Sequence, residues 1–199
     1  MAYRLHDEAS SSEGGSEDEI RRWQELLQGG SPADQRRAAA KLMELRAEQA
    51  LVECLQSDNS LAVGLATTAL WECWMNEQGT TARRELDRGL RQADEGDLAG
   101  ALETFGKLVE AYPGWAEAHN KQATVLYQLG NPRLSYKVCQ VVVELKPHHF
   151  GAWNGLALCA AQMEKWAEVL RAAREALRLQ PSAAANLDLI RLAEAKLAE

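Results

Sequence analysis

Apolar residues recur every three or four positions along most of the chain, the spacing of one face of an α-helix. In the N-terminal third this pattern predicts four helices, over about 17–28, 32–45, 48–56 and 61–77. Ser16 with Glu19, and Ser31 before Pro32, are residues that favour helix N-termini. The preceding Ser-, Gly- and Glu-rich run lacks this spacing, so we expect residues 1–16 to form a disordered acidic tail.

The rest of the chain repeats itself every 34 residues. Pro113, Pro147 and Pro181 keep this interval, and so do Gly96 and Gly130, with Glu164 in the third glycine slot. A period of this length is that of one helix–turn–helix unit. We therefore predict an all-α protein, a right-handed α-solenoid of stacked helix pairs, which is suited to holding another chain.

Residues 82–183 resemble three tetratricopeptide (TPR) repeats, over 82–115, 116–149 and 150–183. Small residues occupy the family's close-packing slots, except at one position taken by Val169: Gly89, Ala123, Ala157, Ala101 and Ser135. The inner slot of the second helix holds Leu108, Val142 and Ala176. Trp153 fills the family's aromatic opening position, from which Glu85 and His119 depart. Residues 184–199 are expected to form a solvated C-terminal capping helix.

The segment before the repeats resembles a HEAT-type repeat in its Arg-x-Ala-Ala-x-x-Leu helix and its Asp-Asn turn. We accordingly expect residues 17–79 to form a HEAT-like helical region joined to the TPR repeats at about 78–81. The runs AHNKQATVLYQLGN and ELKPHHFGAW resemble a subgroup of short bacterial and plastid TPR proteins. This second likeness bears on fold more than on function.

Charge and composition narrow the range of possible functions. The chain has 199 residues and a formal net charge of −7. The first 19 residues carry six acids and one base, whereas residues 80–199 balance 15 acids against 15 bases. A neutral repeat region attracts phosphate backbones and anionic membranes poorly. The four cysteines lack a close pair, and we expect them to pack as small hydrophobes in a reducing compartment.

The resemblance places a binding groove along the first helices of the repeats. Its candidate partner-binding residues are Asn120, Lys121, Thr124, Tyr127, Gln128, Asn154, Leu158 and Gln162. Asn120 and Asn154 stand one repeat apart, and their amides either bind a partner's backbone or bridge adjacent helices. Trp115, at a turn, is a partner anchor if it is exposed and otherwise packs between helices. His148 and His149 have no carboxylate or cysteine at metal-ligand spacing and are expected to cap or pack.

No phosphate loop, nucleophile elbow or metalloprotease motif occurs, so we expect no catalytic residues, no metal and no cofactor. The leading hypothesis is a non-catalytic scaffold that binds a peptide segment or helix of another protein. An assembly factor for an organellar (plastid) complex is the alternative, and an RNA-binding repeat comes third.

A co-chaperone that reads the acidic C-terminus of heat-shock proteins is disfavoured as well. The slots of the family's carboxylate clamp hold Leu86, Leu90, Lys121, Gly151 and Gly155, and only one of these is basic. Without an apolar run of about 20 residues, the sequence predicts a soluble intracellular protein. We expect it in the cytoplasm, or in the plastid stroma if the N-terminus is that of a trimmed precursor.

Overall fold

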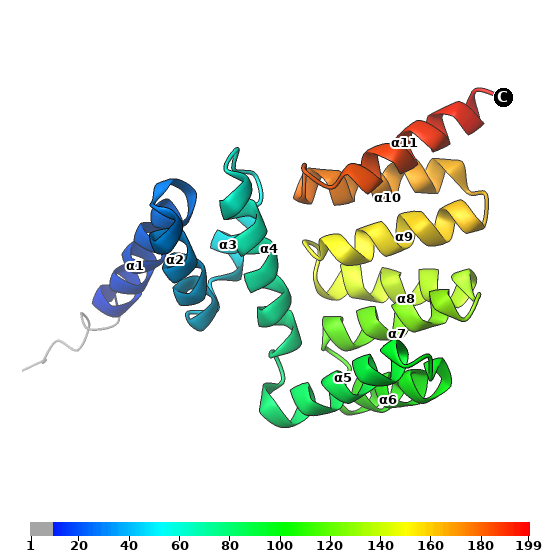
Figure 1. Cartoon of the computed structure of the whole chain (residues 1–199), viewed down its shortest axis with the longest axis horizontal. Helices are drawn as coiled ribbons and strands as arrows, with labels where there is room; N and C mark the ends of the chain where they lie inside the picture. The colour runs from blue at the N-terminus through cyan, green and yellow to red at the C-terminus, as the bar shows by residue number, and fades with distance from the viewer. Residues whose placement is uncertain (1–9) are drawn as a thin grey trace, which may run out of the picture. The chain divides into compact units, whose positions relative to one another are not determined.

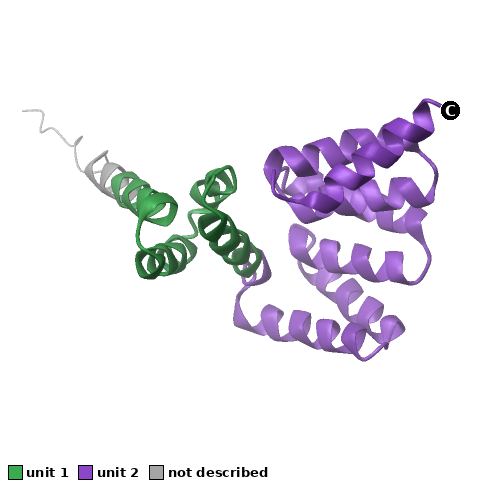
Figure 2. Ribbon diagram, turned by 45° about the horizontal axis from the view of Figure 1, so that its top comes forward, with its two compact units in different colours: residues 1–73 green, residues 74–199 purple. Residues whose placement is uncertain are grey.

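The computed structural model describes the backbone of residues 10–199 and the side chains of residues 17–199. Within this range the chain is entirely helical, with no strand, as predicted. Its helices divide into two compact units, residues 1–73 and residues 74–199 (Figure 2). The division falls at Trp74, near the end of a helix and before the joint expected at 78–81.

The first unit is built from α1 (Ser10–Gly29), α2 (Pro32–Glu44), α3 (Glu48–Cys54) and most of α4 (Ser60–Met75). α2 begins as predicted, because the Ser31 hydroxyl accepts a hydrogen bond from the Asp34 backbone N–H and Pro32 occupies the first turn. The fully buried Leu27, Leu42 and Leu51 form its core with Cys54. The HEAT-like character of residues 17–79 stays a prediction.

The N-terminus differs from expectation. α1 begins at Ser10, so Ser16 lies within the helix instead of capping it. The segment from 10 to 16 contains no proline, and the two glycines at 14 and 15 disfavour a helix without preventing one. The expectation of a disordered tail over 1–16 otherwise falls on residues 1–9, which lie outside the described residues.

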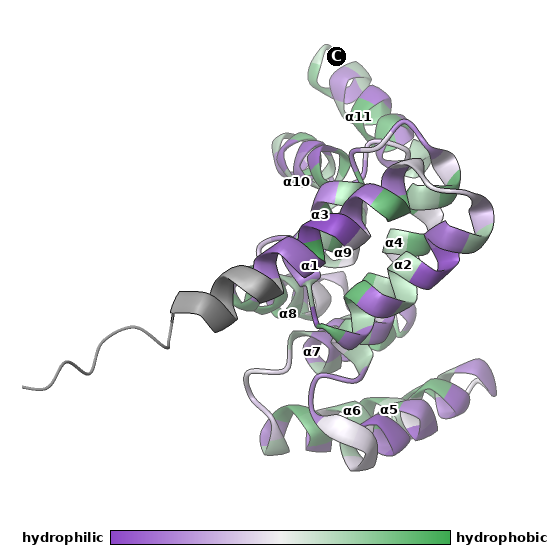
Figure 3. Ribbon diagram, turned by 90° about the vertical axis from the view of Figure 1, so that its left-hand side faces the viewer, coloured by the Kyte–Doolittle hydropathy of each residue, from purple (hydrophilic) through white to green (hydrophobic). Residues whose placement is uncertain are grey.

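The second unit stacks three helix pairs and a final helix (Figure 1). Each helix carries both hydrophobic and hydrophilic residues, as the colours of α5 and α6 show (Figure 3). The pairs are α5 (Gly79–Asp94) with α6 (Leu98–Ala111), α7 (Ala116–Gln128) with α8 (Pro132–Leu145), and α9 (Phe150–Gln162) with α10 (Trp166–Leu179), followed by α11 (Ala184–Leu197). First helices of successive pairs also touch: α5 with α7, α7 with α9, and α9 with α11.

The close-packing slots are buried as predicted. Ala101, Ala123, Ala157 and Ser135 are at most 1% exposed, and Val169 is buried in the slot where it replaces a small residue. Gly89 shows why such slots stay small: a Cβ there would lie 2.5 Å from the Phe105 ring. The helices approach too closely for any larger side chain.

The turns within the pairs share one unusual backbone conformation. Gly96 and Gly130 have φ of 85° and 75°, and Glu164, in the third slot, has φ of 56°. The left-handed region favours glycine, so Glu164 adopts a strained conformation imposed by the repeat. At the last turn, by contrast, α11 has Ala183 as its N-cap, with no side-chain hydrogen bond.

No helix in the described part of the chain is both long enough and apolar enough to cross a bilayer.

Candidate functional site

A pocket of about 200 Å³ lies between the first helices α7 and α9 and the face of α8 beneath them. We call it the central pocket. Its walls come from α7 and α9, and α9 approaches the Cys139 thiol so closely at Gly155 that an added Cβ would lie 2.9 Å from the sulfur. The lining residues are Asn120, Thr124, Tyr127, Ser135, Cys139, Gly151, Asn154, Gly155, Leu158 and Cys159.

Five of the eight sequence-predicted site residues line this pocket together: Asn120, Thr124, Tyr127, Asn154 and Leu158. The other three do not. Lys121 turns to a buried carboxylate, Gln128 is exposed at the end of α7, and Gln162 lines a separate cleft at the helix turns. The 34-residue register therefore brings five of the predicted residues together at one pocket, and the partner-binding role of all eight stays a prediction.

The two asparagines form bonds inside the protein. The Asn120 side-chain amide donates to Glu117 Oε2 at 3.2 Å, and that of Asn154 donates to Asn186 Oδ1 at 2.8 Å. The second bond joins α9 to α11. The Asn154 amide therefore bridges two helices, as one of the two alternatives expects, whereas the Asn120 amide bonds within α7 to the buried Glu117.

A buried charge cluster lies next to the pocket. Glu117 is completely buried on α7, where Lys121 Nζ lies 2.8 Å from Oε1 and His149 Nε2 lies 2.9 Å from Oε2. His149 is the N-cap of α9 and its Nδ1 accepts the Ala152 backbone N–H. Since Nδ1 is an acceptor, the proton sits on Nε2 and is donated to Glu117.

This cluster corrects one expectation and supports another. The sequence showed no carboxylate near His149, because Glu117 is 32 residues away and belongs to the preceding helix pair. The expectation that the histidine caps a helix is confirmed. Its ring also stacks on Trp74, with centroids 4.3 Å apart.

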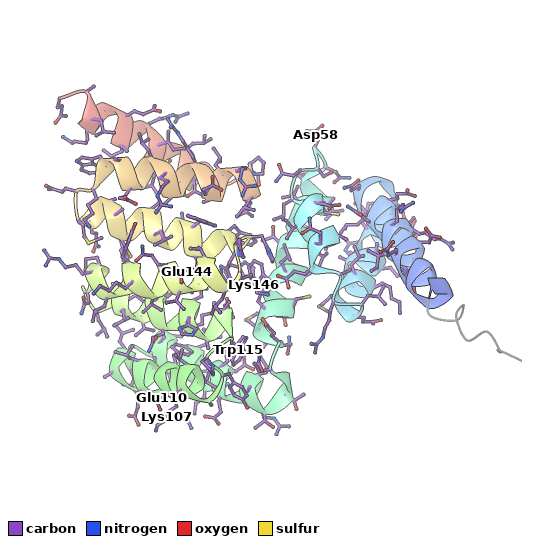
Figure 4. All side chains as sticks on the ribbon, turned by 180° about the vertical axis from the view of Figure 1, so that it is seen from behind. Asp58, Lys107, Glu110, Trp115, Glu144 and Lys146 are labelled. Atoms are coloured by element: carbon purple, nitrogen blue, oxygen red, sulfur yellow. The ribbon has the colours of Figure 1, made fainter. Side chains whose placement is uncertain are left out.

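Trp115 is not an exposed partner anchor. It is fully buried at the start of α7 (Figure 4), and its indole N–H donates to the Trp74 carbonyl at 2.7 Å. Trp115 and His149 are equivalent positions one repeat apart, at the N-caps of α7 and α9. Each side chain therefore bonds the start of a first helix to a residue of an earlier helix: Trp115 to Trp74, and His149 to Glu117.

The buried cluster determines how much net charge lies beside the central pocket. Burial alone would raise the pKa of Glu117, but the hydrogen bond from His149 and the charge of Lys121 outweigh it and hold that pKa below its usual range. Glu117 is thus ionised and offsets the charge of Lys121. Since no lining residue of the central pocket is charged, its walls are polar but uncharged.

The cysteines pack as expected. Cys54, Cys139 and Cys159 are buried, Cys73 is half-buried, and all four are thiols. Burial raises the pKa of Cys54 to about 11, and the contact with Cys159 together with burial raises that of Cys139. The described residues contain no group of three or more His, Cys, Asp or Glu side chains placed to hold a metal ion.

Comparisons with known proteins agree with this architecture. No family model matches the chain. A TPR repeat-containing protein of Rhizobium etli is 27% identical over 84 residues, which span 42% of this chain and 41% of that protein.

Solved structures show the same fold. The first TPR of Spaghetti (RPAP3), bound to the HSP90 peptide SRMEEVD, aligns with a TM-score of 0.58 at 18% identity, over 59% of this chain and 94% of its own. The TPR2B domain of yeast Sti1, in its pHsp70 complex, aligns with a TM-score of 0.56 at 17% identity, over 58% of this chain and 97% of its own. MamA gives 0.56 at 14% identity, over 83% of this chain and 84% of its own. With the 34-residue helix pairs, these matches show that the chain has the tetratricopeptide-repeat fold.

Proposed function

We propose that this protein is a non-catalytic interaction scaffold that binds a segment of another protein over the central pocket. The observation that carries the proposal is the pocket itself. Tyr127 and Leu158 offer apolar surface from two successive first helices, while Thr124 is exposed at the rim. Stacked repeats present such surfaces to extended segments or helices.

The pocket favours an apolar anchor over an acidic one. Its volume of about 200 Å³ suits one large side chain, and its lining holds no charged group. The basic residue nearest to it in the sequence, Lys121, is paired with Glu117 at 2.8 Å. A partner carboxylate here would lose its hydration without gaining a cation in exchange, which is unfavourable.

Selection of random 12-residue peptides on phage tests the proposal. We expect the wild-type protein to enrich peptides that share an aromatic or leucine anchor, and Leu158→Arg to lose them by tenfold or more in affinity. Leu145→Arg is the matched control, because Leu145 is an exposed leucine of α8 outside the pocket lining. Peptides that bind wild type and Leu158→Arg equally well would refute the site.

The peptide SRMEEVD tests the charge argument separately. RPAP3 is seen bound to this HSP90 peptide, whereas the pairing of Lys121 predicts that this chain binds it at least tenfold more weakly than the selected peptides. Equal binding of SRMEEVD would instead place this chain with the chaperone-peptide readers.

A further inference from the structure

We propose a second docking surface, for an acidic segment of a partner protein, in an open cleft at the helix turns. The cleft lies between the α7–α8 turn and the α9–α10 turn and measures about 830 Å³. It shares no lining residue with the central pocket. Its basic residues are Arg133, Lys137 and Lys165, against a single acid, Glu164.

These cations stand out from their surroundings by lacking a carboxylate. Among the described Lys and Arg of residues 80–199, most pair with an acid, as Lys107 does with Glu103 and Arg171 with Glu168. The exceptions are Arg84, Arg91, Arg133, Lys137 and Lys165. Three of these exceptions gather in one cleft, in a repeat region that is otherwise neutral.

The arrangement concentrates positive potential. Arg133 and Lys137 are four residues apart on α8 and so share one helix face. Lys165, at the N-cap of α10, lies on the other side with its Nζ 5.9 Å from the Tyr136 ring centroid. The N-terminal ends of α8 and α10 both border the cleft and add their positive dipole ends to these charges.

Two nearby acids weaken this field: Glu164 lies within the lining, and Glu168 interacts electrostatically with Lys165. The Glu168 carboxylate accepts a hydrogen bond from the Tyr136 hydroxyl at 2.8 Å and another from Arg171 at 3.0 Å. Glu164 is the acid that remains within the lining. The cleft therefore complements a segment with two or three acidic side chains, and Tyr136 and Met163 offer apolar surface beside them.

The occupant we infer is an acidic segment of a partner protein. A patch of three cations is small for a nucleic acid, whose affinity depends on many phosphate contacts, and the whole chain carries −7. The chain's own first 19 residues, with six acids, are a competing occupant that the experiment separates.

Fluorescence anisotropy with a labelled 12-residue Glu/Asp/Gly peptide tests the inference on the full chain. Reversing the cleft, with Arg133→Glu, Lys137→Glu and Lys165→Glu together, is expected to weaken binding tenfold or more. Glutamates at helix N-termini are tolerated, and a melt checks folding; the milder triple change to Gln at the same positions is the second variant. The control reverses exposed cations elsewhere, with Arg84→Glu, Arg91→Glu and Lys107→Glu, and should change binding less than twofold.

Several results would overturn the inference. Equal loss in both triple variants would mean non-specific attraction, and absence of binding at low salt would mean no site. Tighter binding of a 12-nucleotide RNA to the same cleft would assign it to nucleic acid. The six acids of residues 1–19 can be replaced by Asn and Gln. A tenfold gain in affinity for the labelled peptide after this change would mean that the chain's own N-terminus occupies the cleft. Leu158→Arg should leave peptide binding intact, so failure of the central pocket and failure of this cleft are distinguishable.

Discussion

His119 and Trp153 make the same hydrogen bond one repeat apart. His119 Nε2 donates to the Pro113 carbonyl at 2.9 Å, and Trp153 Nε1 donates to the Pro147 carbonyl at 2.8 Å. In both cases a ring N–H on the first helix reaches back to the proline that ends the preceding second helix. His119, which departs from the aromatic pattern in sequence, therefore keeps its function in the structure.

This equivalence predicts the effect of substitution at 119. His119→Phe keeps a ring but loses the N–H, and should cost about 0.5–1.5 kcal/mol in the free energy of unfolding. His119→Trp should retain most of the stability, because an indole N–H already makes this bond at 153. Urea denaturation of both variants checks the pair, and equal losses would show that ring packing alone matters.

Glu117→Gln removes the charge at the centre of the buried cluster. We expect a loss of about 2–3 kcal/mol at pH 7, below the range for fully enclosed pairs because the Lys121 side chain is 19% exposed. Glu103→Gln, in the exposed pair with Lys107, should change stability little.

The same variant predicts a pH dependence. The folded-state pKa of Glu117 is lowered, so its stabilisation is fully present above the ordinary carboxyl pKa of about 4.3 and lost as pH falls through the folded value. The gap in unfolding free energy between wild type and Glu117→Gln should be constant from pH 6 to 8 and shrink below about pH 4. A gap that persists unchanged at pH 3 would contradict the ionised state.

Gly89→Ala should destabilise by about 1–3 kcal/mol although alanine favours helices, because its Cβ would meet the Phe105 ring at 2.5 Å. Gly64→Ala is the matched control on α4, where nothing lies within 4 Å of the added Cβ. That change should stabilise by up to about 1 kcal/mol. Thermal melts with the same sign for both would contradict the close approach of α5 and α6.

Glu164→Gly should stabilise by about 1 kcal/mol, since it relieves a left-handed backbone at φ 56°. Gly96→Ala makes the reverse change at φ 85°, in open space, and should cost about the same. Calorimetry of the two variants measures the strain of this turn without any change in packing.

The double variant Asn120→Ala, Asn154→Ala separates the two interpretations of the asparagines. The bonds to Glu117 and Asn186 predict a lowered melting temperature, with a loss of about 1–2 kcal/mol for each residue. An unchanged melt with weakened binding of a selected peptide would instead mean that these amides serve the partner.

Periodicity explains why much of the fold was predictable. A 34-residue interval places Pro113, Pro147 and Pro181 at helix ends, and the resemblance to TPR repeats supplied the slots where helices meet and small residues are needed. The pairing of charged side chains could not be predicted in this way, because periodicity says where a residue lies and not which residue it contacts. The four-residue spacing of Glu117 and Lys121 permits their ion pair, but nothing in the sequence indicated that the carboxylate is buried or that His149 also binds it.

One signal in the sequence could have found these pairs. Three side-chain bonds between successive repeats join residues 32 apart: Glu117 with His149, Tyr136 with Glu168, and Asn154 with Asn186. The facing partner thus lies two residues short of a full period. A search for complementary polar residues at this interval connects Glu117 to His149 by spacing alone.

The N-cap bond of His149 also has a consequence for how the stack opens. Because one imidazole holds both the first turn of α9 and the carboxylate of α7, neither helix can fray without exposing an ionised group that lost its hydration on folding. α11 has no such tie: besides the apolar packing of Ala193 against Ala160 and Val169, it makes the exposed pair of Arg174 with Glu194 and the bond of Asn154 with Asn186. Amide hydrogen exchange should therefore run from the C-terminal end inward, with α11 exchanging by local opening and α7 only when the whole repeat unit unfolds.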